Sequence, residues 1–222
     1  MKTKLKRLLG SLAAGFLVSA LPLTAWADAV ILHTNDIHCG IAKNIHIAAV
    51  TQYKHDLQKE NPEVILVDAG DAIQGEPIGS LSRGAAIIRI MDSADYDFAI
   101  PGNHEYDFGM DRYLELAAQL GCGYYSCNFI DKRTGGPVFP THKHITLDGK
   151  KIALIGVTTP ETLISSAPKF FQDENGKFIY GFCEDEDGTK LATLGKIIIH
   201  DDGSIGAGYE NPEGQGRITI IE

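Results

Sequence analysis

The sequence has few basic residues outside its first 27 positions, few cysteines and no internal repeat. Four of the 20 Lys and Arg residues lie within residues 1–27, which leaves 16 basic against 29 acidic groups, a formal charge of −13. So acidic a chain repels the backbone of nucleic acids, and we expect no nucleic acid partner. A small phosphate ester could still bind, because a local cation would outweigh the distant charge.

Cysteine is scarce, with four residues in a chain of 222. In an exported protein four thiols could form disulfides in three pairings, but four is also a normal count for buried thiols. Cys39 directly follows the candidate metal ligand His38, and we do not expect it in a bridge. The sequence leaves the state of the cysteines open: Cys39, Cys122, Cys127 and Cys183.

Long apolar runs are absent except for one near the N-terminus, from Leu8 to Leu23, which follows three Lys and one Arg. Ala25-Trp26-Ala27 comes next and matches the small-x-small pattern of a cleavage site. A retained membrane anchor is the alternative, but the run is short for a membrane span. We therefore expect residues 1–27 to be a secretory signal peptide. The remaining chain would be exported (periplasmic, cell-surface or extracellular) and would keep no stable membrane anchor.

Apolar patterns predict alternating strands and helices in the first half of the mature chain. The expected strands are Val30–Leu32, Val64–Val67 and Phe98–Ile100. The expected helices are Asn44–Glu60, Gly84–Ser93 and Asp111–Leu120. Four apolar residues at i+4 spacing define the buried face expected for the first helix: Ile45, Ala49, Tyr53 and Leu57. This alternation is typical of α/β proteins with parallel strands.

Lys151–Thr158 is expected to be another buried strand, and the alternation ends after it. Glu161–Lys190 shows no convincing amphipathic helix, and its stretches Asp173–Gly176 and Glu184–Gly188 are interpreted as turns and solvated loops. Two final strands are expected at Leu194–His200 and Arg217–Ile221.

Polar side chains follow each of the first three predicted strands: Asp36 and His38, then Asp71, then Asn103 and His104. Because ligand sites gather at the carboxyl ends of parallel strands, we expect these groups to converge. Asp, Asn and His suit a hydrolytic site with two divalent ions. A single Asp-x-His occurs by chance, but the ordered set, with spacings of 35 and 32 residues, is specific.

A two-ion site gives the first four of these residues different roles. Asp71 is the candidate bridge between the ions, because the preceding Gly70 permits a tight turn and a close approach. Asp36 and His38 can both turn toward one ion, and Asn103 offers a neutral carbonyl oxygen to the second.

His104 could meet the substrate phosphate, and either protonate the leaving group or stabilise charge. Asp107, three residues later, could hold the imidazole of His104 in one tautomer. These two residues are the candidate catalytic pair.

Four segments closely resemble the 5′-nucleotidase branch of the calcineurin-like metallophosphoesterases: Leu32–His38, Val67–Ala72, Pro101–Asp107 and Ile155–Pro160. The resemblance covers residues 29–190 and implies a four-layer α/β/β/α sandwich that hydrolyses nucleotide phosphate monoesters outside the cytoplasm. It implies two divalent ions, Zn, Mn or similar. The resemblance assigns the metal ligands Asp36, His38, Asp71 and Asn103. It assigns His104 and Asp107 as the catalytic dyad.

The sequence departs from this family pattern, because it contains no Gly-His pair. The family has a Gly-His and then a Gly-His-x-His further along the chain. His142-Lys143-His144 does not replace them, since it follows Thr141 and precedes the Lys151–Thr158 strand. We interpret it as exposed positions on a sheet edge, and His200 as a turn residue.

The departure predicts an incomplete phosphoesterase domain over residues 28–222, with a junction near residues 188–192. Gly188–Leu191 resembles the start of two different family segments, so our hypothesis is an internal deletion between short repeats or an assembly error of that form. We also expect the chain to lack the C-terminal nucleotidase domain of the family. We expect one or fewer tightly bound ions, poor stability, and weak or absent hydrolysis.

Two alternatives remain for the function. The chain could be a nucleotide-sugar or cyclic-nucleotide phosphodiesterase, with the same metals and a different substrate. It could also be a non-catalytic remnant that binds metal or phosphate.

Overall fold

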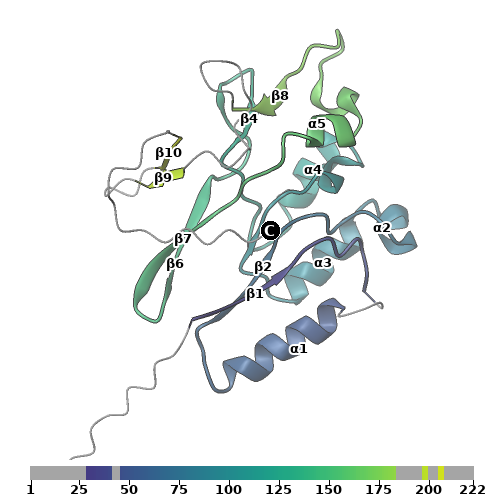
Figure 1. The fold of residues 1–222 in the computed structure, drawn as a ribbon. Helices are drawn as coiled ribbons and strands as arrows, with labels where there is room; N and C mark the ends of the chain where they lie inside the picture. The colour runs from purple at the N-terminus through teal and green to yellow at the C-terminus, as the bar shows by residue number, and fades with distance from the viewer. Residues whose placement is uncertain (1–28, 42–45, 184–196, 200–204, 208–222) are drawn as a thin grey trace, which may run out of the picture.

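The computed structural model describes residues 29–41, 46–183, 197–199 and 205–207 (Figure 1). The expected signal peptide, the expected junction near residues 188–192 and the expected strand Arg217–Ile221 lie outside the described residues. Within the described residues, none of the helices combines the length and the hydrophobicity that crossing a membrane requires.

Three parallel strands form the sheet that carries the candidate site, in the order β1-β2-β3. They are β1 (Val30–Thr34), β2 (Val64–Asp68) and β3 (Phe98–Ala99). All five residues of β2 are buried, as a continuous apolar run predicts for a strand packed on both faces. The three expected strands and their parallel pairing are confirmed, so their carboxyl ends lie at one edge of the sheet.

The two faces of this sheet pack against different layers. Leu66 and Ala99 belong to the larger core cluster, which also contains side chains from the helices. Ile65 and Val67 face the other way and pack with apolar residues of a β-hairpin. The described residues therefore form three layers of the expected four-layer sandwich, in the order helices, parallel sheet, hairpin.

The hairpin consists of β6 (His142–Leu147) and β7 (Lys150–Ile155), which pair antiparallel. The prediction of a buried strand over Lys151–Thr158 was wrong in its burial, because every residue of β7 is exposed or half-buried. Only alternate side chains of the hairpin face the parallel sheet. His144 is exposed, as expected, whereas His142 is half-buried.

Helix α1 spans Ile47–Gln58, close to the expected range. Its buried face differs from the expected one, because Tyr53 is 57% exposed while Ile47 and Lys54 are buried. Ile45 lies outside the described residues. The apolar pattern was misleading because it excluded a lysine from the buried face.

Lys54 is buried because it has an acidic partner. Its ammonium nitrogen lies 2.8 Å from a carboxylate oxygen of Asp97, and its side chain is 1% exposed. The same oxygen of Asp97 accepts a hydrogen bond of 2.8 Å from the backbone N–H of Leu66. This network ties α1 to β2 and to the start of β3.

We expect Lys54→Met to lower the free energy of unfolding by about 2 kcal/mol, because it leaves the half-buried Asp97 carboxylate without its cation. Lys59→Met is the matched control, since Lys59 is 70% exposed and pairs with Asp56 at the surface. Urea unfolding of both variants checks this. Equal midpoints for the two variants would show that the buried pair adds nothing.

The other helices pack on the same face of the sheet as α1. They are α2 (Pro77–Ser82), α3 (Ala85–Ser93) and α4 (Met110–Ala117). Helices α3 and α4 were expected with slightly different ends, and both contribute to the larger core cluster. Helix α2 was missed because it is six residues long and rich in Pro, Gly and Ser.

A second small sheet pairs β4 (Phe129–Asp131) with β5 (Gly136–Pro137) and β8 (Tyr180–Phe182). Helix α5 (Thr162–Ser165) is a single turn, in keeping with the absence of a convincing amphipathic pattern after residue 160. A 3₁₀ turn, η2 (Pro168–Phe171), follows it.

Further along the chain, β9 (Ile197–Ile199) pairs antiparallel with β10 (Ile205–Ala207). Strand β9 is the described part of the expected strand Leu194–His200, whereas β10 was not expected.

The structure answers the question that the sequence left open about the cysteines. All four thiols are free, and Cys39 is completely buried. Burial raises the pKa of the Cys39 thiol to about 11, and the charge of Glu105 adds to this effect. Cys39 is therefore an unreactive core residue.

Candidate functional site

The loops that follow β1 and β2 lie side by side beyond the ends of the strands. The backbone N–H of Asp36 donates to the carbonyl of Gly70 over 3.1 Å, and that of His38 donates to the carbonyl of Asp71 over 3.0 Å. The pairing of the two strands thus continues into the loops, which places the first two polar motifs next to each other.

Three of the sequence-predicted residues adopt a left-handed backbone conformation. The φ angles are 52° for Asp36, 43° for His38 and 59° for Asp71. This conformation is unfavourable for residues other than glycine and costs roughly 1–3 kcal/mol each. Strain of this kind persists where neighbouring contacts enforce it, and it is found most often at functional sites.

The loop after β3 packs directly against the loop after β2, because Gly70 and Gly102 face each other and neither has a side chain. Gly70 has a φ of +105°, and a Cβ at this position would lie 2.5 Å from the backbone nitrogen of Gly102. A Cβ on Gly102 would lie 2.6 Å from the backbone nitrogen of Asp71. The predicted tight turn at Gly70 is present in the structure, and Gly102 has no more room for a side chain than Gly70.

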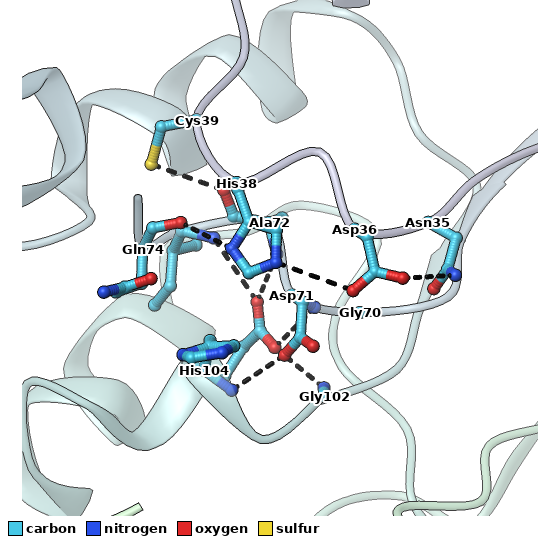
Figure 2. Close-up of polar contacts among 12 residues, drawn as sticks. Asn35, Asp36, His38, Cys39, Gly70, Asp71, Ala72, Gln74, Gly102 and His104 are labelled. Carbon is cyan, nitrogen blue, oxygen red and sulfur yellow. Dashed lines mark hydrogen bonds and ion pairs between the residues drawn. The ribbon is translucent and has the colours of Figure 1, made fainter. Parts of the chain in front are cut away.

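His38, Asp71 and His104 converge, with one potential ligand atom from each lying within 4.8 Å of the others (Figure 2). A carboxylate oxygen of Asp36 lies 3.6 Å from Nε2 of His38, at the rim of this group. Asn103 directly precedes His104, and its backbone carbonyl accepts a hydrogen bond. The structure therefore brings the three sequence motifs together at one edge of the sheet.

Hydrogen bonds orient both imidazole rings in the same way. Nδ1 of His38 lies 3.1 Å from the carbonyl oxygen of Gln74 (Figure 2), and Nδ1 of His104 lies 2.7 Å from a carboxylate oxygen of Asp107. Since both partners are acceptors, each Nδ1 donates a proton and each Nε2 is left for another ligand. Ligands to metals typically show this arrangement, with the second ring nitrogen bound to a carbonyl or carboxylate.

The predicted pairing of His104 with Asp107 is present in the structure, although its catalytic role stays a prediction. Burial lowers the pKa of His104, but the hydrogen bond and the charge of Asp107 outweigh this effect, so the pKa is raised overall. The Asp107 carboxylate therefore favours a protonated imidazole.

Asp71 lies at the centre of the group. One of its carboxylate oxygens accepts a hydrogen bond of 2.7 Å from the backbone N–H of His104 (Figure 2). Burial raises the pKa of the Asp71 carboxyl, whereas this hydrogen bond lowers it. A partly buried carboxylate beside two imidazoles is a favourable partner for a cation.

Glu105 holds the loops beneath these side chains, a role that was not predicted for it. It is completely buried, and its carboxylate accepts hydrogen bonds from four backbone N–H groups. They belong to Asp71 at 2.9 Å, Ala72 at 2.8 Å, Ile73 at 3.4 Å and Gly102 at 2.7 Å. Burial and the charge of Asp71 raise its pKa to about 6, although the N–H bonds oppose this rise.

A second buried carboxyl supports the loop after β2. Asp68 accepts a hydrogen bond of 2.7 Å from the hydroxyl of Thr34 and one of 3.1 Å from the backbone N–H of Gly70. The hydroxyl of Tyr96 lies 2.9 Å from that of Thr34. Burial raises the pKa of the Asp68 carboxyl well above its usual range.

The donor set fits a divalent ion. It combines imidazole nitrogen and carboxylate oxygen, the mixture that suits Zn, Mn and Fe. Nε2 of His38 lies 3.6 Å from a carboxylate oxygen of Asp36, and one carboxylate oxygen of Asp71 is held by the backbone N–H of His104 in the third loop. The structure thus supports a cation site at His38 and Asp71, with Asp36 and His104 adjacent.

Comparison with known proteins agrees with this geometry. The family model for calcineurin-like phosphoesterases matches residues 29–195. A 5′-nucleotidase from Vibrio vulnificus (strain CMCP6) is 30% identical over 162 residues, which cover 67% of this chain and 29% of that protein. A 5′-nucleotidase from Bos taurus is 26% identical over 196 residues, which cover 77% of this chain and 33% of that protein. The chain thus spans about a third of the length of these relatives.

Solved structures show the same fold. An NAD nucleotidase from Haemophilus influenzae superimposes with a TM-score of 0.59 and 26% identity. The superposition covers 71% of this chain and 30% of the nucleotidase chain. A calcineurin-like phosphoesterase from Bacillus subtilis superimposes with a TM-score of 0.55 and 22% identity. The superposition covers 71% of this chain and 55% of the phosphoesterase chain. With the family match over most of its length and the α/β fold of these structures, the chain belongs to the calcineurin-like phosphoesterase family.

Proposed function

We propose that this chain is an exported, metal-dependent phosphoesterase of 5′-nucleotidase type that hydrolyses nucleotide phosphate monoesters. The observation that carries the proposal is the convergence of His38, Asp71 and His104, with Nδ1 of each histidine held by an acceptor. The names of the relatives support a nucleotide as the substrate class. The N-terminal pattern of basic, apolar and small residues supports export.

The metal ligands in this proposal are Asp36, His38, Asp71 and Asn103. Divalent ions held there would acidify a water molecule and offset the negative charge of the phosphate. Glu105 keeps the Asp71 and Gly102 loops in contact, so the ligands are in place before an ion arrives.

His104 and Asp107 supply the proton chemistry. With its Nδ1 proton held by Asp107, His104 presents Nε2 toward the group formed with Asp71 and His38. From there it can give a proton to the leaving oxygen or stabilise charge on the phosphate. The carboxylate of Asp107 favours the charged imidazole that either role requires.

The sequence lacks the Gly-His and Gly-His-x-His motifs, and this limits the proposed activity. Without those histidines the second ion would have only Asp71 and Asn103, too few protein ligands for tight binding. We therefore propose that this chain holds one ion tightly and turns over phosphate esters weakly.

Two other functions each have an observation in their favour. The NAD nucleotidase among the structural relatives favours a substrate with a phosphodiester or pyrophosphate bond, such as a nucleotide sugar or a cyclic nucleotide. The missing histidine motifs favour a non-catalytic remnant that binds metal.

Hydrolysis of a chromogenic phosphate monoester with added Mn²⁺ or Zn²⁺ tests the proposal. We expect weak turnover that falls by about 100-fold or more in His104→Ala, the usual contribution of a positioned acid or base. His144→Ala is the control, because His144 is exposed on β6. Ion binding without turnover would instead support the remnant, and hydrolysis of a diester alone would support the phosphodiesterase.

A further inference from the structure

The side chain of Ser166 contacts the loop after β3 on both sides of His104, at Asn103 and at Asp107. Ser166 directly follows α5 and is 3% exposed. Its hydroxyl oxygen lies 2.7 Å from the backbone carbonyl oxygen of Asn103 and 3.1 Å from carboxylate oxygen Oδ1 of Asp107. The hydroxyl therefore bonds to the two residues that flank the 3₁₀ turn η1 (His104–Tyr106). These residues lie about 60 positions before Ser166 in the sequence.

The two bonds have a clear physical consequence. Oδ2 of Asp107 is taken by Nδ1 of His104, and Oδ1 is taken by the hydroxyl of Ser166. A carboxylate that is held at both oxygens cannot rotate about its bond to Cβ without losing one of them. The serine has a single hydroxyl proton, so the carbonyl of Asn103 and the carboxylate of Asp107 share it.

Ser166 is itself fixed in place. Its backbone N–H donates to the carbonyl of Thr162 over 3.1 Å, and Thr162 and Leu163 of α5 are both buried. The backbone of Ser166 is therefore tied to α5, and the hydroxyl is held in one rotamer by its contacts with Asn103 and Asp107. A buried hydroxyl with an immobile backbone is suited to hold another group in one orientation.

We propose that Ser166 is a positioning residue, which holds Asp107 and the carbonyl of Asn103 so that the imidazole of His104 keeps its place beside Asp71. This inference rests on the proposed function for its effect on turnover, but its effect on the His104 ring does not depend on catalysis. The sequence gives no sign of this role, because Ser166 lies 59 residues after Asp107 in a segment without a recognisable motif.

Ser166→Ala removes only the hydroxyl oxygen, so we expect the chain to fold. Ser165→Ala is the matched control, because Ser165 is the preceding residue and is exposed. Two measurements are made on the full chain. The first is the proton NMR signal of the Nδ1–H group of His104, assigned by its loss in His104→Ala. The second is kcat and KM for the chromogenic ester with Mn²⁺.

In Ser166→Ala we expect the Nδ1–H signal to broaden or disappear through exchange with water. We expect kcat to fall by about tenfold, the usual effect of losing one hydrogen bond to a charged group, while KM stays within about twofold. Asp107→Ala combined with Ser166→Ala should be no slower than Asp107→Ala alone, because both changes break the same link. Ser165→Ala should match the unmodified chain in both measurements.

An unchanged Nδ1–H signal in Ser166→Ala would overturn the inference, and so would fully additive losses in the double variant. If the unmodified chain hydrolyses no phosphate ester, the proposed function fails, but the NMR comparison still decides whether Ser166 positions His104.

Discussion

Glu105→Gln is expected to lower the free energy of unfolding by about 3 kcal/mol or more, the largest stability loss that we expect from a single change in this chain. The carboxylate accepts hydrogen bonds from four backbone N–H groups on two loops. A glutamine side chain has one oxygen, so its NH₂ group would face N–H donors. At least one buried backbone N–H would then lose its acceptor.

Urea unfolding at pH 7.5 checks this prediction, because a pKa of about 6 leaves Glu105 mostly ionised at that pH. Glu115→Gln is the control, since Glu115 is 64% exposed and pairs with Arg112 at the surface. If both variants unfold at the same urea concentration, Glu105 does not hold the loops together. The account of a preformed site would then be wrong.

Asp71→Asn is expected to weaken the binding of Mn²⁺ or Zn²⁺ by more than about 100-fold, since changes in groups that merely support ligands already cost 10–100-fold. Asp71 is the only carboxylate in the group with His38 and His104. The amide keeps one oxygen that can accept the hydrogen bond from the backbone N–H of His104, so the loop geometry should survive. Titration calorimetry on the metal-free chain measures the affinity.

Asp111→Asn is the control for this measurement, because Asp111 is exposed in the first turn of α4. We expect it to bind the ion as the unmodified chain does. A loss of affinity in Asp111→Asn as large as that in Asp71→Asn would show a general effect of charge on binding. It would leave the proposed ligand without support.

The parts of the fold that surround the site could be predicted because they depend on local patterns. A run of four apolar residues predicts β2, and the parallel order of the strands follows from the helices between them. Since parallel strands end at one edge, the convergence of residues from three loops followed from their positions after three strands. The pairing of Asp107 with His104 was predictable because three residues separate them.

Other features could not be predicted because they depend on contacts between distant segments. Gln74 binds Nδ1 of His38 through its backbone carbonyl, which every residue type possesses. Glu105 was visible inside the Pro101–Asp107 segment, but three of its four partners lie in the loop after β2, more than 30 residues earlier, and meet it only when the loops pack together. The buried face of α1 was wrongly predicted because the acidic partner of Lys54 lies 43 residues away.

The proposed chemistry requires that a divalent cation bind at the edge of the sheet where His38, Asp71 and His104 meet. The most direct test is the number of Mn²⁺ or Zn²⁺ ions that remain per chain after exhaustive dialysis, measured by mass spectrometry of the metal. We predict one ion for the unmodified chain and none for Asp71→Asn. No retained ion, two tightly held ions, or equal retention by the variant would contradict the account.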